Sequence, residues 1–183
     1  MNQWPTYEQK LAEYWAAYKD KTQSVMIRFF RYLPKSDLTL IVLKGHLLLE
    51  ESLNELFLRI LKLPSAIDDA RLTFFQKVCV AQAIMDDVGG HPHFWRSLKR
   101  LNAIRNKFAH KLDPSDIQQE VSVFMEDVFE AGGKPSKEVR DEIGANKVEL
   151  LLKIGIMSVF VGVRALIDGL DAAKYYPMEG EDS

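Results

Sequence analysis

The segment best suited to chemistry spans residues 105–110, which begin with Arg105 and Asn106 and end with His110. A guanidinium offers paired donors that match phosphate oxygens, and an imidazole exchanges protons near neutral pH. An arginine and a histidine acting together are therefore suited to binding a phosphate ester and transferring protons on it. The candidate catalytic residues are Arg105, Asn106 and His110.

These residues are expected to occupy the end of a helix that begins near Pro92. Pro114 must close this helix, because the residue before a proline is pushed out of the α region, so His110 falls in the last turn. At about 100° per residue, Asn106 and His110 lie about 40° apart around the helix, but Arg105 and His110 lie about 140° apart. Arg105 and His110 can act on one group only if the final turn loosens or a second subunit contributes another copy of these residues.

Arg105 also interrupts the apolar stripe of its own helix. A guanidinium on a core-facing position needs an acidic or polar partner, or an opening to an anion. The long helix that precedes it offers Glu50, which shares a face with His46 and Asn54. We therefore predict an ion pair between Glu50 and Arg105, with His46 and Asn54 in support. The apolar stripe consists of Phe94, Leu98, Leu101, Phe108 and Leu112.

A basic face runs beside the stripe on the same helix. Such a face either contacts the phosphates of RNA or is simply solvated, since charges at helical spacing are common on exposed helix surfaces. Trp95 could add a stacking surface for a base. The candidate RNA-binding residues are Arg96, Lys99, Arg100, Lys107 and Lys111.

Helical periodicity recurs along the whole chain and strand-like alternation is hard to find, which predicts an all-α fold. We expect one helical-bundle domain of about five to six helices over residues 1–176. Its core bundle covers about 36–130, followed by a long C-terminal helix and a flexible acidic tail at 177–183. The expected helices span about 6–32, 38–62, 68–85, 92–110, 114–130 and 136–173, with Ser36 or Asp37 capping the second.

Charge and composition narrow the functional classes. The net charge of −2 gives no global positive field that would draw the chain to nucleic acid or membrane, so contact with RNA needs a local patch. Cys79 is the only cysteine, which excludes an intrachain disulfide and fits a reducing cytoplasm. The most apolar stretch, 154–163, is about half a membrane span and predicts a buried helix. No secretion signal is evident at the start.

Other candidate sites are weaker. His91 and His93 are not at the spacing of a known zinc site, so we expect no metal and no cofactor. Phosphate-binding loops and hydrolase motifs are not found in the sequence. Three glycines, Gly155, Gly162 and Gly169, recur every seven residues in the last helix and predict a face of close approach. That face serves either packing within the bundle or a homodimer seam.

Residues 101–110 resemble the signature of the HEPN superfamily of helical bundles, in which an arginine is followed by four to six residues and then a histidine. Here four residues separate Arg105 from His110, and the residue after the arginine is polar, Asn106, as is usual in that superfamily. Residues 45–51 also resemble an earlier helix of several such proteins. The likeness covers residues 38–112.

The resemblance implies a homodimer that cleaves RNA without a metal, as toxin–antitoxin or phage-defence effectors do, with an antitoxin or other regulatory protein as a possible partner. Arg105 would then bind the phosphate, Asn106 would orient it or its neighbours, and His110 would perform acid–base chemistry on the 2′-hydroxyl or the leaving oxygen. The alternative is a non-catalytic helical module that binds a protein or nucleic acid. In that module Arg105, Glu50 and Asn106 form a structural network.

Overall fold

The computed structural model describes residues 23–24, 27–29, 31–85, 92–110, 116–132 and 148–175, with side chains described as far as residue 170. These residues form helices and no strand, which confirms the predicted all-α class. Most of the expected first helix, the expected start of the last helix and the acidic tail lie outside them. The helices are α2 (Leu38–Ile60), α3 (Ser65–Asp69), α4 (Phe74–Met85), α5 (Pro92–His110), α6 (Ile117–Gly132) and α8 (Val148–Tyr175).

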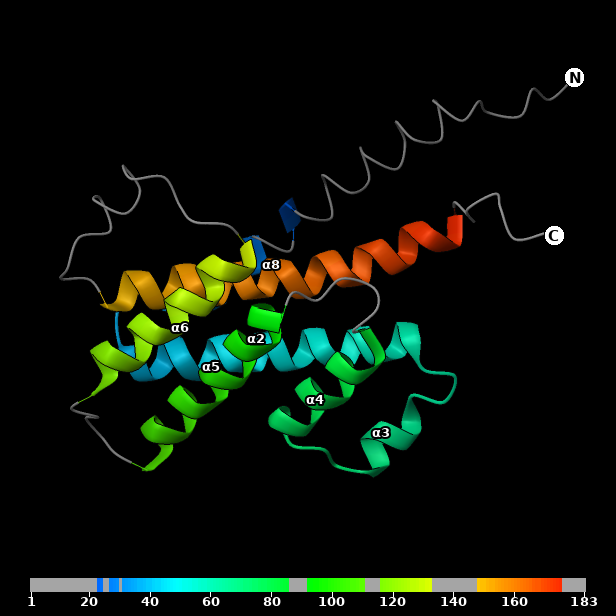
Figure 1. Ribbon diagram of the computed structural model, residues 1–183, viewed down its shortest axis with the longest axis horizontal. Helices are drawn as coiled ribbons and strands as arrows, with labels where there is room; N and C mark the ends of the chain where they lie inside the picture. Colours follow the sequence, from blue (N-terminus) through cyan, green and yellow to red (C-terminus); the bar gives the residue numbers. More distant parts are fainter. Residues whose placement is uncertain are drawn as a thin grey trace, which may run out of the picture.

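Two long helices, α2 and α8, lie side by side and run in the same direction (Figure 1). Near their starts they approach closely, since a β-carbon on Gly45 would lie 2.8 Å from the side chain of Ile156. Further along, Arg164 of α8 forms an ion pair with Glu55 of α2. The antiparallel hairpin of α5 and α6 packs on this pair, and α4 packs against α2 and α5.

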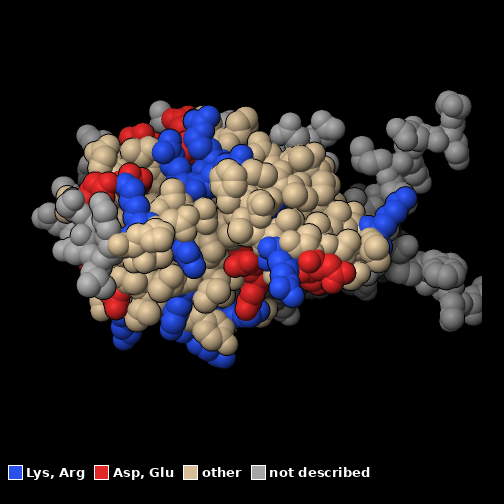
Figure 2. Space-filling model, turned by 90° about the horizontal axis from the view of Figure 1, so that it is seen from below, with Lys and Arg blue, Asp and Glu red and all other residues tan. Residues whose placement is uncertain are grey.

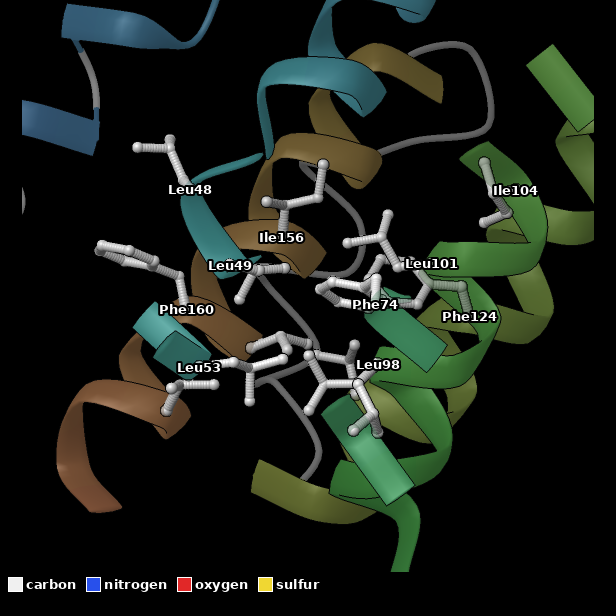
Figure 3. Packing of buried hydrophobic residues seen from close by; sticks show 14 of the residues in the cluster. Leu48, Leu49, Leu53, Phe74, Leu98, Leu101, Ile104, Phe124, Ile156 and Phe160 are labelled. Atoms are coloured by element: carbon white, nitrogen blue, oxygen red, sulfur yellow. The ribbon is translucent and has the colours of Figure 1, made fainter. Parts of the chain in front are cut away.

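The core lies where α5 meets its neighbours. Figure 3 shows apolar side chains from α2, α4, α5, α6 and α8 converging on one cluster. Burying them fixes the axis and the rotation of α5, because a dense core tolerates little displacement of its members. The fully buried members of this cluster include Leu49, Leu53, Leu98, Leu101, Ile104, Phe124 and Ile156.

The start of α2 agrees with the sequence. Asp37 is the N-cap and its carboxylate accepts a hydrogen bond from Leu40 N at 3.0 Å. Leu49 and Leu53 are fully buried, whereas Leu47 is 60% exposed, because α8 and α5 cover the other side of the helix.

The predicted third helix, 68–85, is wrong in its first turns. The chain forms the short α3, leaves the helical conformation at Arg71 with φ 49°, and starts again as α4. Thr73 and Gln76 explain the restart. Gln76 Oε1 accepts from Thr73 N at 2.9 Å and Thr73 Oγ1 accepts from Gln76 N, the reciprocal pattern of a capping box.

The last helix is more apolar than the sequence estimate suggested. Residues Val148–Leu170 are long and apolar enough, by length and composition alone, to cross a membrane. The sequence prediction considered only residues 154–163, the most apolar part, which Lys153 and Arg164 flank. In the fold α8 packs against α2 and α6, and Arg164 is ion-paired within the bundle, so one face of the described part of α8 belongs to the core.

The glycine face of α8 packs within the chain at two of its three positions. A β-carbon on Gly155 would lie 2.4 Å from the ring of Phe124, and one on Gly162 would lie 2.5 Å from the ring of Phe94. Gly169 has no described atom within 4 Å of such a β-carbon. Packing within the bundle is therefore the role of Gly155 and Gly162, and a homodimer seam along all three glycines is wrong.

Candidate active site

The three candidate catalytic residues lie at the C-terminal end of α5, which stays helical to His110. Arg105 is partly exposed, whereas Asn106 and His110 are exposed. Arg105 Nη1 donates a hydrogen bond to Asn106 Oδ1 at 3.2 Å. No other hydrogen bond or ion pair of Arg105 occurs among the described residues. Within the described part of the chain, most donors of the guanidinium are therefore unused.

The predicted ion pair between Arg105 and Glu50 is wrong. Glu50 Oε1 instead accepts from Lys77 Nζ of α4 at 2.8 Å. The reason is a rotation of the buried face of α5, which runs from Leu101 to Ile104, not Arg105. Ile104 fills the core position, so Arg105 stays at the edge of the core and needs no buried acid.

His46 does lie between α2 and α5, as a member of a small polar cluster. Its Nε2 donates to Asn102 Oδ1 at 3.3 Å, and its ring contacts that of Phe74 with centroids 4.1 Å apart. Burial lowers the pKa of His46 from its ordinary value, and the charges of Arg105 and Lys77 lower it further, against opposing contributions from Asn102 and Glu50. His46 is thus a neutral structural link near neutral pH.

Asn54, the third supporting residue of α2, is partly exposed and makes no side-chain hydrogen bond within the described part of the chain. The shared face predicted for His46, Glu50 and Asn54 therefore divides into separate environments. His46 contacts α5, Glu50 contacts α4, and Asn54 contacts neither through a hydrogen bond.

Much of the predicted basic face of α5 is partnered within the chain, by side chains of α4 and α6 and by Asp116, which directly precedes α6. Lys107 contacts both Asp116 and Glu120, and these two hydrogen bonds raise its pKa. Lys99 Nζ donates to Gln82 Oε1 at 2.7 Å. The last member of the predicted face, Lys111, lies outside the described residues.

Trp95 cannot stack on a base as predicted, because it is fully buried. Its indole sits on the core side of α5 with its ring edge toward Phe94, at 5.0 Å between centroids. Trp95 lies three residues before Leu98, so the two side chains share one face of α5. The predicted apolar stripe included Leu98 but not Trp95. The interpretation of Trp95 as an RNA contact is therefore wrong.

The side chain that the sequence estimate missed is Asp127 of α6, which is only 4% exposed. His93 Nδ1 donates to its Oδ1 at 2.9 Å, Arg96 Nη1 lies 3.4 Å from the same oxygen, and Arg100 Nε donates to Oδ2. The signal was available, since Glu120 and Asp127 of α6, and Asp116 directly before it, recur at helical spacing. Such an acidic row matches a basic helix packed antiparallel to it.

The charges do not merge into one large patch on the face drawn in Figure 2. Basic side chains there form several groups, separated by acidic side chains and uncharged surface. This pattern agrees with the net charge of −2. Any contact with a nucleic acid on this face must therefore be local.

An apolar groove of about 310 Å³ lies between α5, α6 and α8. Its two hydroxyls are already used, since Ser97 donates to Phe94 O and Ser158 donates to Ile154 O. The groove therefore offers shape but no acid–base group. No group of three histidine, cysteine or acidic side chains that could hold a metal ion occurs in the described part of the chain.

The regular end of α5 decides between the two routes by which Arg105 and His110 could meet. Because the helix continues to His110, the loosened turn that would bring the two side chains together within one chain is not present. On a regular helix they diverge by about 140°. A site that uses both on one phosphate therefore needs a second copy of the chain.

Comparison of the chain with protein-family models, curated proteins and solved structures finds no match. The chemistry of the site must therefore be argued from its own geometry.

Proposed function

We propose that the chain is a metal-independent endoribonuclease of HEPN type that acts as a homodimer. The observation that carries the proposal is the state of Arg105. Its guanidinium is partly exposed, touches no carboxylate among the described residues, and donates a hydrogen bond to the exposed Asn106. An arginine at a helix edge that no described carboxylate neutralises is suited to a phosphodiester, whose oxygens accept paired hydrogen bonds.

The reaction would use the substrate's own 2′-hydroxyl as nucleophile. His110 of one copy accepts the proton of that hydroxyl, and the oxygen attacks the adjacent phosphorus. The bond from phosphorus to the 5′-oxygen breaks, and that oxygen takes a proton from solvent water. Arg105 stabilises the charge that develops on the phosphoryl oxygens. The products are a 2′,3′-cyclic phosphate and a 5′-hydroxyl.

Asn106 would orient the guanidinium, because its side-chain oxygen accepts from Arg105 Nη1. An amide that fixes one end of a guanidinium leaves the remaining N–H groups directed at a ligand. The supporting network of His46 and Asn102 would act at a distance, by holding α5 against α2. Neither His46 nor Glu50 takes a direct part in the proposed reaction.

The end of α5 is the proposed dimer seam, because Gly155 and Gly162 of α8 are occupied by side chains of the same chain. The exposed basic side chains of α5 are the proposed RNA contact. The proposed setting is the cytoplasm, where a toxin or phage-defence effector would meet RNA and a regulatory protein such as an antitoxin.

The test is cleavage of a mixed RNA pool by the purified chain in EDTA, with analysis of the product ends. The wild type should leave 2′,3′-cyclic phosphates, and Arg105→Ala and His110→Ala should each lose about 10²–10⁴-fold in rate. Lys44→Gln, which removes an exposed charge on α2, is the matched control and should keep its activity. An inactive wild type would favour the non-catalytic binding module.

A further inference from the structure

The side chains around Asp127 form a second polar cluster, on the face of α5 that packs against α6. His93, Arg96 and Arg100 lie within about 60° of one another around the helix, so one carboxylate of α6 can reach all three. Asp127 accepts from each of them. This cluster takes no part in the chemistry proposed for Arg105 and His110.

The cluster holds more positive than negative charge. Its two guanidiniums face a single carboxylate, and neither has another partner among the described residues. Asp127 is buried, but the side chains of Arg96 and Arg100 are 51% and 38% exposed. The excess positive charge therefore faces solvent, where an anion can reach it.

The donors that remain are arranged for an anion. Arg100 binds Asp127 through Nε, which leaves both of its terminal amino groups available. Arg96 uses Nη1 and keeps Nη2 and Nε. Paired N–H groups in a rigid fork match the oxygens of a phosphate group, and two such forks can bind one phosphate or two neighbouring ones.

Asp127 supplies what an exposed pair of arginines lacks, which is a fixed orientation. A free arginine side chain loses substantial conformational entropy when it binds a ligand, and a prior anchor reduces that loss. The geometry points to a second anion site, in which buried Asp127 holds Arg96 and Arg100 in place to bind a phosphate group. The phosphate belongs either to an RNA backbone or to a small phosphate ester.

This site is separate from the proposed catalytic one. Arg100 and Arg105 lie about 140° apart around α5 and about 7.5 Å apart along its axis. The proposal therefore does not depend on ribonuclease activity. A chain that bound phosphate here but cleaved no RNA would keep this site and lose the proposed function.

The experiment measures binding of two probes to the full chain in a His110→Ala background, which keeps any RNA intact. One probe is a fluorescently labelled single-stranded oligouridylate, followed by anisotropy, and the other is inorganic phosphate, followed by calorimetry. Arg100→Gln should weaken binding of at least one probe on the order of tenfold. Lys44→Gln, the charge-matched control on α2, should leave both affinities unchanged.

Asp127→Asn gives the sharper result, because a diffuse electrostatic attraction and an anchored site predict opposite changes in binding affinity. The substitution makes the net charge more positive by one, so a diffuse electrostatic attraction would become equal or stronger. Loss of the anchor should instead weaken binding severalfold. Phosphate binding that follows these variants would indicate a small-ester site, and RNA binding alone would indicate a backbone contact.

Three outcomes would overturn the proposal: no binding of either probe to the background protein, equal effects of Arg100→Gln and Lys44→Gln, or tighter binding by Asp127→Asn. Circular dichroism and thermal melting check that each variant is folded. If Asp127→Asn does not fold, Arg96→Gln and Arg100→Gln decide the question, because their exposed side chains can be replaced without burying a charge.

Discussion

At the scale of single side chains, one neighbour determines the state of Arg105. Ile104 occupies the core position on α5, so Arg105 lies at the edge and is not neutralised by an acid among the described residues. Periodicity alone could not decide between adjacent positions, because a helical stripe is wide enough to admit either. The sequence therefore predicted the wrong partner for Arg105, and the catalytic role of Arg105 stays a prediction.

Asp127 is a second residue whose environment the sequence alone does not reveal. The sequence led to no prediction for Asp127, and only the packing of α6 against α5 reveals that it is buried and bound by three basic side chains. Charged residues are almost never fully buried unless they are paired. Pairing across two helices depends on their register, which one sequence does not specify.

The buried imidazole of His46 leads to a prediction on acid stability. Its pKa is lowered in the folded chain, so the unfolded chain binds a proton near the ordinary value of 6.5 that the folded chain refuses. The stabilisation is complete above that value and is lost as the pH falls below it. The charges that face His46 are Glu50 of α2, Lys77 of α4 and Arg105 of α5.

We therefore expect the free energy of unfolding to fall between about pH 8 and about pH 5, and to fall less in His46→Gln. Urea unfolding at several pH values measures both slopes. Other titrating groups contribute to both proteins, so the difference between the slopes isolates His46. Equal slopes would show that this imidazole titrates alike in the folded and unfolded chains.

At the scale of the elements, the sequence predicted the bounds of α5 and the cap of α2 because local chemistry sets both. The rule that a helix closes before a proline agrees with the bounds of α5, and Asp37 caps α2 through its own side chain. The break before α4 was missed although the capping box of Thr73 and Gln76 was present in the sequence.

The glycines of α8 give a prediction at the element scale. A methyl group at Gly155 would lie 2.4 Å from Phe124 and 2.7 Å from Met125 Sδ, so Gly155→Ala should destabilise the fold by about 1–3 kcal/mol. Gly169→Ala meets no described atom within 4 Å and should stabilise the helix by about 0.5–1 kcal/mol.

Thermal and urea unfolding of the two alanine variants measure the difference. Gly169→Ala also serves as the control for substitution in the same helix. If both variants lost stability equally, a contact outside the described residues or with a second copy of the chain would be using Gly169.

At the scale of the whole molecule, packing in the helical bundle keeps the side chains of Arg105 and His110 pointing in different directions. The core fixes the rotation of α5, and the helix remains regular to His110, so the angle between Arg105 and His110 cannot relax within one chain. A two-fold axis near the end of α5 would place Arg105 of one copy opposite His110 of the other. The proposed function therefore requires a dimer.

Mixing two inactive variants tests this account most directly. Arg105→Ala and His110→Ala are unfolded together, refolded together, and assayed for RNA cleavage in EDTA beside each variant alone and the wild type. If half of the dimers are mixed, and one of their two composite sites is intact, about a quarter of the wild-type activity should return. Each variant alone should stay inactive. A wild type that cleaves RNA and a mixture that does not would contradict a site shared between two copies, and an inactive wild type would contradict the nuclease itself.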